Sequence, residues 1–93
     1  MSEVVRRVVK VHLTPHFERS FHSLPPTVQR LAAQRDTIFQ NNAFGSSLRT
    51  HPLRGKLKGL WSYSVNYRYR ILFEFINDRE VLYHDIGSHS IYR

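Results

Sequence analysis

The spacing of hydrophobic residues divides the first part of the chain into a strand and a helix. Residues 8–13 are β-branched and alternate imperfectly between apolar and polar, which predicts a first strand. Thr14 and Pro15 form a typical helix start, with a capping side chain followed by a proline in the first turn. Apolar residues then recur at helical spacing, at Phe17, Phe21 and Leu24. These residues predict a helix with one face toward the core.

A second helix follows a proline break. Pro25-Pro26 ends the first helix, because proline disfavours helical geometry in the residue before it. The next helix is expected to begin near Pro26 and to stop at Asn41-Asn42. Its apolar stripe consists of Val28, Leu31, Ala32, Ile38 and Phe39. The two helices are therefore predicted to form a short hairpin.

The second half of the chain predicts a long loop and three strands. Residues 43–59 have loop composition, and long ordered loops tend to be functional. Strands are expected over residues 61–65, 70–76 and 80–86, with a tight turn at Asn77-Asp78. The predicted order is β-α-α-β-β-β, an α+β fold in which the helix hairpin packs on one face of an antiparallel sheet. We expect a single domain over residues 1–93, in which a tail from Gly87 follows the last strand.

Composition narrows the class of protein. The chain is 41% hydrophobic and contains six Phe, five Tyr and one Trp, which is typical of a folded domain rather than a disordered tail. It contains no cysteine, which excludes disulfides, thiolate metal sites and a cysteine nucleophile. No apolar run approaches the ~20 residues that span a bilayer, and the N-terminus lacks the apolar core of a signal peptide. We therefore expect a cytoplasmic protein without membrane association.

Positive charge is concentrated in the middle of the chain. The formal net charge is +7, and no acidic residue occurs between Asp36 and Glu74. That interval contains the cations Arg49, Arg54, Lys56, Lys58, Arg68 and Arg70, interleaved with Trp61, Tyr63, Tyr67 and Tyr69. Cations beside aromatic side chains suit RNA or single-stranded nucleic acid, whose bases stack. A basic domain without a polyanionic ligand is the alternative.

Three blocks of sequence resemble a known family. Residues 53–62, 67–73 and 86–92 are similar to the signature blocks of the RelE/ParE superfamily of bacterial and archaeal type II toxins. The tail is most similar to the YafQ-like branch, with its Gly-Ser-His motif at residues 87–89. The resemblance implies a ribosome-dependent mRNA endoribonuclease that needs no cofactor and contacts mRNA and the 16S rRNA. It also implies a small acidic antitoxin as partner, in a hetero-oligomer.

Metal-free RNA cleavage requires a proton acceptor, a phosphate ligand and a proton donor around the 2′-hydroxyl. By resemblance, Arg70 is the phosphate ligand, and His89 and His51 are the candidates for general acid and base. Tyr92 matches the C-terminal aromatic residue that stacks a base or donates a proton. The alternatives are a surface ion pair for Arg70, a histidine that caps or packs the terminus for His89, an aromatic residue that packs the sheet edge for Tyr92, and a solvated loop residue for His51.

The basic loop is predicted to bind RNA. Arg54, Lys56 and Lys58 would contact backbone phosphates, and the same set of candidates includes Arg68 and Trp61. A solvated loop is the alternative for the cations, and a core position is the alternative for Trp61, because a tryptophan at the start of an alternating strand usually packs inside.

Departures from the YafQ-like pattern leave the acid and base open. Arg68 occupies the place of an acidic residue, and serines and tyrosines occupy the place of a second histidine. His84 is a possible substitute, and Asp85 could orient a histidine. His51, His84 and His89 show neither H-x₃-H nor HExxH spacing, so no metal site is expected from them.

Two other functions remain open for this sequence. A ParE-like inhibitor of DNA gyrase would have the same fold without nuclease activity. A non-catalytic RNA-binding module, or a decayed toxin, would keep the basic surface alone. The nuclease hypothesis requires that the basic loop, the start of the strand at Arg70 and the tail meet on one surface.

Overall fold

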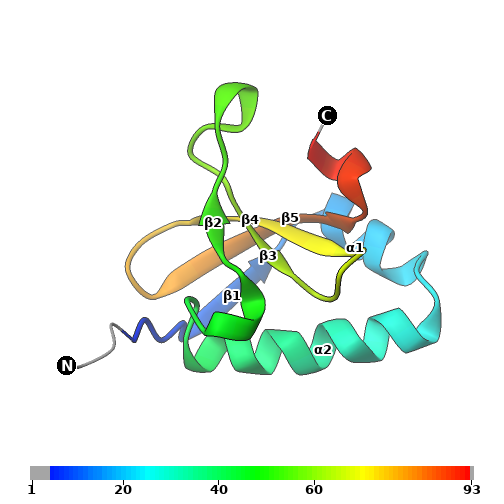
Figure 1. The fold of residues 1–93 in the computed structure, drawn as a ribbon, viewed down its shortest axis with the longest axis horizontal. Helices are drawn as coiled ribbons and strands as arrows, with labels where there is room; N and C mark the ends of the chain where they lie inside the picture. The colour runs from blue at the N-terminus through cyan, green and yellow to red at the C-terminus, as the bar shows by residue number, and fades with distance from the viewer. Residues whose placement is uncertain (1–4, 93) are drawn as a thin grey trace.

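Five strands form one mixed sheet, and two helices cover one of its faces (Figure 1). The computed structural model describes residues 5–92; residues 1–4, where we expected no signal peptide, and the last residue of the predicted tail lie outside this range. The sheet order is β1-β5-β4-β3-β2. The strands are β1 Lys10–Leu13, β2 His51–Pro52, β3 Trp61–Ser64, β4 Arg70–Phe75 and β5 Glu80–Gly87. This is the α+β architecture predicted from the sequence.

The helices are α1, Pro15–His22, and α2, Pro26–Asn41, with the predicted break between them. The Thr14 hydroxyl oxygen accepts a hydrogen bond from the Phe17 backbone N–H at 3.0 Å, which caps α1. The same hydroxyl donates to the His84 carbonyl oxygen at 3.1 Å. One side chain therefore starts the helix and fixes it to β5.

The sheet differs from the prediction in two respects. First, β1 runs parallel to β5, with Lys10 opposite Glu80 and Leu13 opposite Tyr83, whereas we expected antiparallel pairing throughout. Parallel neighbours need a long connection, and here the helix hairpin and the three middle strands lie between them. Second, β2 lies inside the predicted loop and pairs with β3. A strand of two residues has no periodicity by which to recognise it.

Aromatic rings fill the core between the helices and the sheet. Phe39 of α2 is fully buried, and its ring centroid lies 4.6 Å from that of Tyr63 and 4.9 Å from that of Phe73. The ring centroid of Phe17 on α1 lies 5.3 Å from that of Tyr83 on β5. Both helices therefore pack on the sheet face that carries these rings, and the alternate residues of each strand belong to the opposite, open face.

A chain of hydrogen bonds crosses this core. The hydroxyl oxygens of Tyr63 and Tyr83 lie 2.8 Å apart, and Tyr83 donates to the Asp36 carboxylate at 2.7 Å. Burial raises the pKa of both Tyr63 and Tyr83 above the ordinary value, because the phenolate would be desolvated. The chain gives each buried hydroxyl a partner, as a stable core requires.

None of the helices within residues 5–92 is both long enough and apolar enough to cross a membrane.

Candidate functional site

The strand register brings several candidate residues to the open face of the sheet. Tyr63 and Phe73 face the helices, so Ser62 and Leu72 lie on the other side. One cross-strand row on this side consists of His51, Ser62, Leu72 and Asp85, and the next consists of Ser64, Arg70 and Gly87. His51 and Arg70 therefore share one face, although they are 19 residues apart in the chain.

The C-terminal tail bends back over this face. It forms a short 3₁₀ helix, η3, His89–Tyr92, at the end of β5. The Tyr92 and Ser62 hydroxyl oxygens lie 2.7 Å apart, and Ser62 is fully buried. The His89 ring centroid lies 5.9 Å from that of Tyr92. The tail therefore places Tyr92 against β3 on the open face, with the exposed His89 beside it.

Gly87 makes this bend possible. A Cβ atom at position 87 would lie 2.6 Å from the Ile91 Cγ2 atom, well inside van der Waals contact. The glycine of the Gly-Ser-His segment therefore has a steric function: it lets the tail close onto the sheet.

Arg70 lies beside the start of the tail, since its Cα partner on β5 is Gly87. Its guanidinium is half-buried and donates from Nη1 to the Asn66 carbonyl oxygen at 2.6 Å. The ion pairs found within residues 5–92 do not include Arg70. A positioned guanidinium with no carboxylate partner is the arrangement that a phosphate ligand requires.

His51 presents one ring nitrogen as a proton acceptor. Its Nδ1 atom lies 2.9 Å from the Arg49 carbonyl oxygen, which can only accept a hydrogen bond. Nδ1 therefore carries the proton, and in the neutral imidazole Nε2 has the free lone pair. The side chain is exposed on the edge strand β2, so Nε2 is accessible to a ligand.

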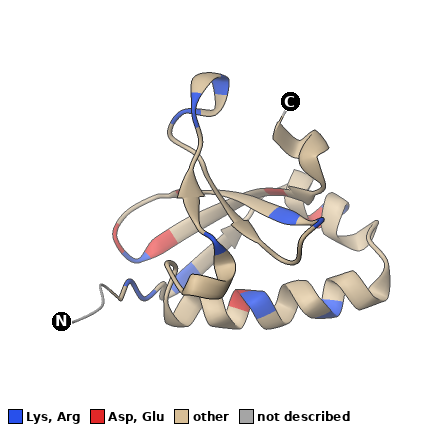
Figure 2. Cartoon of the chain, in the orientation of Figure 1, with Lys and Arg blue, Asp and Glu red and all other residues tan. Residues whose placement is uncertain are grey.

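The basic loop extends away from the sheet between β2 and β3 (Figure 1). Arg54, Lys56 and Lys58 are all exposed around a short 3₁₀ turn, η2, Gly55–Leu57. Gly55 and Gly59 have φ angles of +66° and +97°, which side chains rarely adopt, and they bend the loop at both ends. The loop cations are therefore displayed as a separate projection above the open face (Figure 2).

The two remaining predicted RNA contacts lie elsewhere. Arg68 is exposed in the β3–β4 turn, with its guanidinium carbon 5.6 Å from the Tyr69 ring centroid, and the neighbouring Tyr67 is 90% exposed. Trp61 shares the helix-side face with Tyr63 and packs edge-to-face on Phe75 at 5.3 Å. Trp61 thus occupies the core position that was its alternative, away from the open face.

Three histidine–carboxylate pairs lie on α1 and on strands β1, β4 and β5. From the sequence, Asp85 was a candidate to orient a histidine without its partner being known, and the pairs of His12 and His84 were not predicted. The Nε2 atoms of His84, His12 and His16 lie 2.7, 2.8 and 3.1 Å from carboxylate oxygens of Glu74, Glu80 and Asp85. The hydrogen bond from His12 lowers the pKa of Glu80. A register shift near Leu72 leaves His84 as an extra residue on β5, and only the fold could reveal that pairing.

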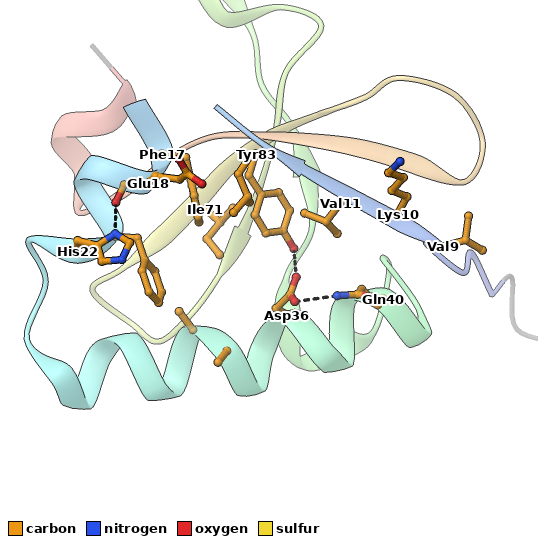
Figure 3. A pocket seen from close by; sticks show the side chains of 14 residues that line it. Val9, Lys10, Val11, Phe17, Glu18, His22, Asp36, Gln40, Ile71 and Tyr83 are labelled. Atoms are coloured by element: carbon orange, nitrogen blue, oxygen red, sulfur yellow. Dashed lines mark hydrogen bonds between the residues drawn. The ribbon is translucent and has the colours of Figure 1, made fainter. Parts of the chain in front are cut away.

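A cleft of about 550 Å³ lies on the helix side, between β1, α1 and α2 (Figure 3). Buried residues including Phe17, Ala32 and Tyr83 form its floor, and the exposed Val9 and Leu13 form part of its rim. The Asp36 carboxylate lines it and is already bonded to Tyr83 and Gln40, each at 2.7 Å.

No group of three or more histidine, cysteine, aspartate or glutamate residues within the described chain is arranged to hold a metal ion.

The fold is that of the RelE/ParE toxins. The toxin–antitoxin complex RelBE2 from Mycobacterium tuberculosis matches with a TM-score of 0.74 over 95% of this chain and 97% of that chain, at 20% identity. The YoeB/ParE toxin from Agrobacterium tumefaciens matches with a TM-score of 0.72 over 87% and 99%, at 13% identity. YafQ from E. coli matches with a TM-score of 0.69 over 88% and 94%, at 14% identity. Neither a family model nor a curated protein matches the sequence.

Proposed function

We propose that this chain is the toxin of a type II toxin–antitoxin pair and that it cleaves mRNA on the ribosome. The observation that carries the proposal is the pairing of Arg70 with Gly87, which sets a guanidinium without a carboxylate partner beside the histidine-bearing tail. The basic loop rises next to the same face. The shared fold supports the toxin assignment, and the site chemistry supports the nuclease.

The proposed reaction uses the RNA 2′-hydroxyl as nucleophile. His51 Nε2 takes the proton of this hydroxyl, and the 2′-oxygen attacks the adjacent phosphorus. Arg70 stabilises the charge that develops on the phosphoryl oxygens. The bond from phosphorus to the 5′-oxygen breaks, and His89 as imidazolium gives that oxygen its proton. The products are a 2′,3′-cyclic phosphate and a 5′-hydroxyl, and no metal or cofactor takes part.

The message would be held by the exposed cations of the basic loop and by aromatic stacking. Arg54, Lys56 and Lys58 suit backbone phosphates, which they meet as solvated charges without competing carboxylates in the same loop. Tyr67, which is almost fully exposed at the β3–β4 turn, offers a ring to an unpaired base. Arg68 beside it adds a further cation.

The proposed partner is an acidic antitoxin in the cytoplasm. A net charge of +7 favours a partner of opposite sign, and the similar structures of RelBE2 and of DinJ–YafQ are toxin–antitoxin complexes. Co-expression with the product of an adjacent short reading frame should yield a complex that co-purifies and no longer arrests growth. Failure of every neighbouring product to bind would contradict this part of the proposal.

The test of the nuclease is primer extension on mRNA from cells that express the chain. The wild type should produce discrete cuts within translated regions and arrest growth. Arg70→Ala and His89→Ala should abolish both effects, and His51→Ala should slow cleavage by about 10²-fold or more. Arg19→Ala removes an exposed cation from α1 and serves as the control, which should cleave like the wild type.

Three results would contradict the nuclease. Cuts that persist undiminished in both Arg70→Ala and His89→Ala would remove the proposed site. Growth arrest with loss of supercoiling and intact mRNA would favour the gyrase inhibitor. Binding of RNA with neither cuts nor growth arrest would favour a non-catalytic RNA-binding module. Circular dichroism of each purified variant separates a lost site from a lost fold.

A further inference from the structure

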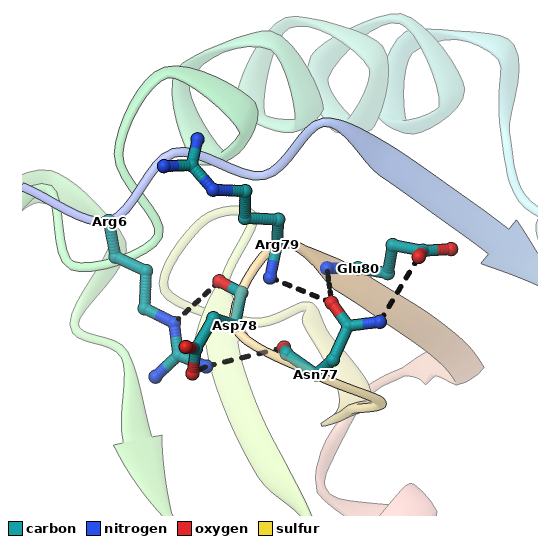
Figure 4. Close-up of polar contacts among 5 residues, drawn as sticks. All are labelled: Arg6, Asn77, Asp78, Arg79 and Glu80. Atoms are coloured by element: carbon teal, nitrogen blue, oxygen red, sulfur yellow. Dashed lines mark hydrogen bonds and ion pairs between the residues drawn. The ribbon is translucent and has the colours of Figure 1, made fainter.

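A second basic surface lies where the N-terminal segment meets the β4–β5 turn (Figure 4). It is a hollow of about 460 Å³ lined by Val5, Arg6, Arg7, Asp78 and Arg79. Among the described residues that line it, three are arginines and one is acidic. Neither the sequence motifs nor the proposed reaction uses this surface.

The backbone around the hollow is fixed. The Arg6 N–H donates to Asn42 Oδ1 at 3.1 Å, and the Arg6 carbonyl oxygen accepts from the Ala43 N–H at 2.8 Å. The Val9 N–H donates to the Arg79 carbonyl oxygen at 2.8 Å. The N-terminal segment is therefore held between the end of α2 and the β4–β5 turn, so the backbone that carries its arginines is fixed.

Arg6 is held in place without being neutralised. Its guanidinium carbon lies 3.8 Å from the Phe75 ring centroid, and its Nε atom donates to the Asp78 carbonyl oxygen at 3.1 Å. A second bond runs from Nη2 to the Asn77 carbonyl oxygen at 3.4 Å. These partners are uncharged, and the Asp78 carboxylate is a fully exposed partner at 3.8 Å, which contributes little in water.

The other two arginines are exposed. Arg7 and Arg79 take part in none of the ion pairs found within residues 5–92. Three arginines thus line the hollow with one solvated carboxylate, and Figure 4 shows the side chains of Arg6 and Arg79 extending in different directions. Guanidinium forks match phosphate oxygens in geometry as well as in charge, so the hollow suits a phosphate-bearing ligand.

The absence of a stacking surface narrows the ligand further. None of the residues that line the hollow is aromatic, and the ring beneath it, Phe75, is covered by Arg6. Unpaired bases are recognised by stacking, whereas double-stranded RNA is recognised by its backbone and shape. We propose that this hollow binds the phosphate backbone of double-stranded RNA.

Within the proposed function, on which this part of the inference rests, the hollow is an anchor on ribosomal RNA. In Figure 2 the basic positions of the N-terminal segment and of the β4–β5 turn lie at one side of the molecule, apart from those of the basic loop. The basic loop and the open face would bind the single-stranded mRNA, and the hollow would bind a double-stranded helix of ribosomal RNA. Two sites on one rigid body raise the overall affinity without any new contact between them.

The test measures binding of the purified protein to a 20-base-pair RNA duplex of arbitrary sequence at several salt concentrations. The variant Arg7→Ala/Arg79→Ala should bind at least about tenfold more weakly at low salt. Its slope of log affinity against log salt should be smaller by about 2, since each phosphate contact contributes about 0.9. The control Arg19→Ala/Arg30→Ala removes the same charge from exposed positions on the helices and should change both quantities far less.

Additional measurements distinguish the possible causes of weaker duplex binding. Equal loss in the two double variants would overturn the proposal, because net charge alone would then explain binding. Equal loss of binding to a polyglutamate peptide and to the duplex would also overturn it, in favour of an acidic protein ligand. Arg70→Ala should retain duplex binding, because Arg70 lies on the open face. If the chain cleaves no mRNA but its binding to the duplex still depends on Arg7 and Arg79, the assignment to ribosomal RNA is wrong. The duplex-binding site itself would then still stand.

Discussion

The hydroxyl oxygens of Ser62 and Tyr92 lie 2.7 Å apart, although 30 residues separate them in the chain. Ser62 is fully buried on β3, and Tyr92 is the last residue that the structure describes. The contact therefore fixes the end of the chain to the open face. The position of His89 depends on it, because His89 lies in the same turn as Tyr92.

Loss of this contact should weaken the fold measurably. Tyr92→Phe removes one hydroxyl and leaves the buried Ser62 hydroxyl without a partner, which should lower the free energy of unfolding by about 1 kcal/mol. Adding Ser62→Ala to the Tyr92→Phe variant should then lower the free energy of unfolding by almost nothing further. Urea unfolding of the two single variants and the double variant measures the coupling. Additive effects would show that the two hydroxyls do not interact.

Substitution of Gly87 should displace the tail. Gly87→Ala places a Cβ atom against the Ile91 side chain, and overpacking of this kind costs about 1–3 kcal/mol. The double variant Gly87→Ala/Ile91→Ala removes the clash and should recover most of the loss relative to Ile91→Ala alone. Denaturant titration is the measurement. An equal cost of Gly87→Ala in both backgrounds would mean that Ile91 is not the obstacle.

Phe39 should be the residue on which the core depends most. Its ring is fully buried and contacts rings from three strands, at Tyr63, Phe73 and Tyr83. Phe39→Ala should cost about 3–5 kcal/mol, which is a large part of the stability of a small domain. Ile38→Ala, at the neighbouring and partly exposed position, is the matched control and should cost less than about 1 kcal/mol. Similar losses in the two variants would contradict this core.

The buried tyrosines should make the protein less stable at alkaline pH. Burial raises the pKa of Tyr63 and Tyr83, so above pH ~10 the unfolded chain releases protons that the folded chain keeps. Stability is therefore complete below pH ~10 and falls as the pH rises further. Urea unfolding between pH 8 and 11, with phenolate absorbance, tests this. Tyr63→Phe should flatten the dependence, and the exposed Tyr67→Phe should not; a flat profile in the wild type would refute it.

Local signals in the sequence were sufficient for most of the elements. The proline at position 26 and the asparagine at position 41 mark the observed ends of α2, and the strand predicted to begin at Arg70 does so. The direction of β1 could not be predicted in this way. Its register against β5 depends on contacts between residues about 70 positions apart, and its hydrophobic pattern is the same in either direction.

The candidate site was predictable in its residue types and not in its contacts. Arg70, His51, His89 and Tyr92 were named from local motifs, and their roles stay predictions. The contact between Ser62 and Tyr92 needed the tail to fold back, and a serine in an alternating strand gives no sign of that. The arginines at positions 6, 7 and 79 were missed as a group, because only the pairing of β1 with β5 brings the two segments together.

The pairing of β1 with β5 also determines when the sheet can be completed during synthesis. β1 pairs with β5, the last strand within residues 5–92, so neither β1 nor the outer edge of β4 has its neighbour until β5 has been synthesised. A nascent chain that stops before β5 lacks the strand that joins β1 to β4, and with it the tail that carries His89 and Tyr92. Premature termination before β5 should therefore release a fragment that cannot complete the sheet.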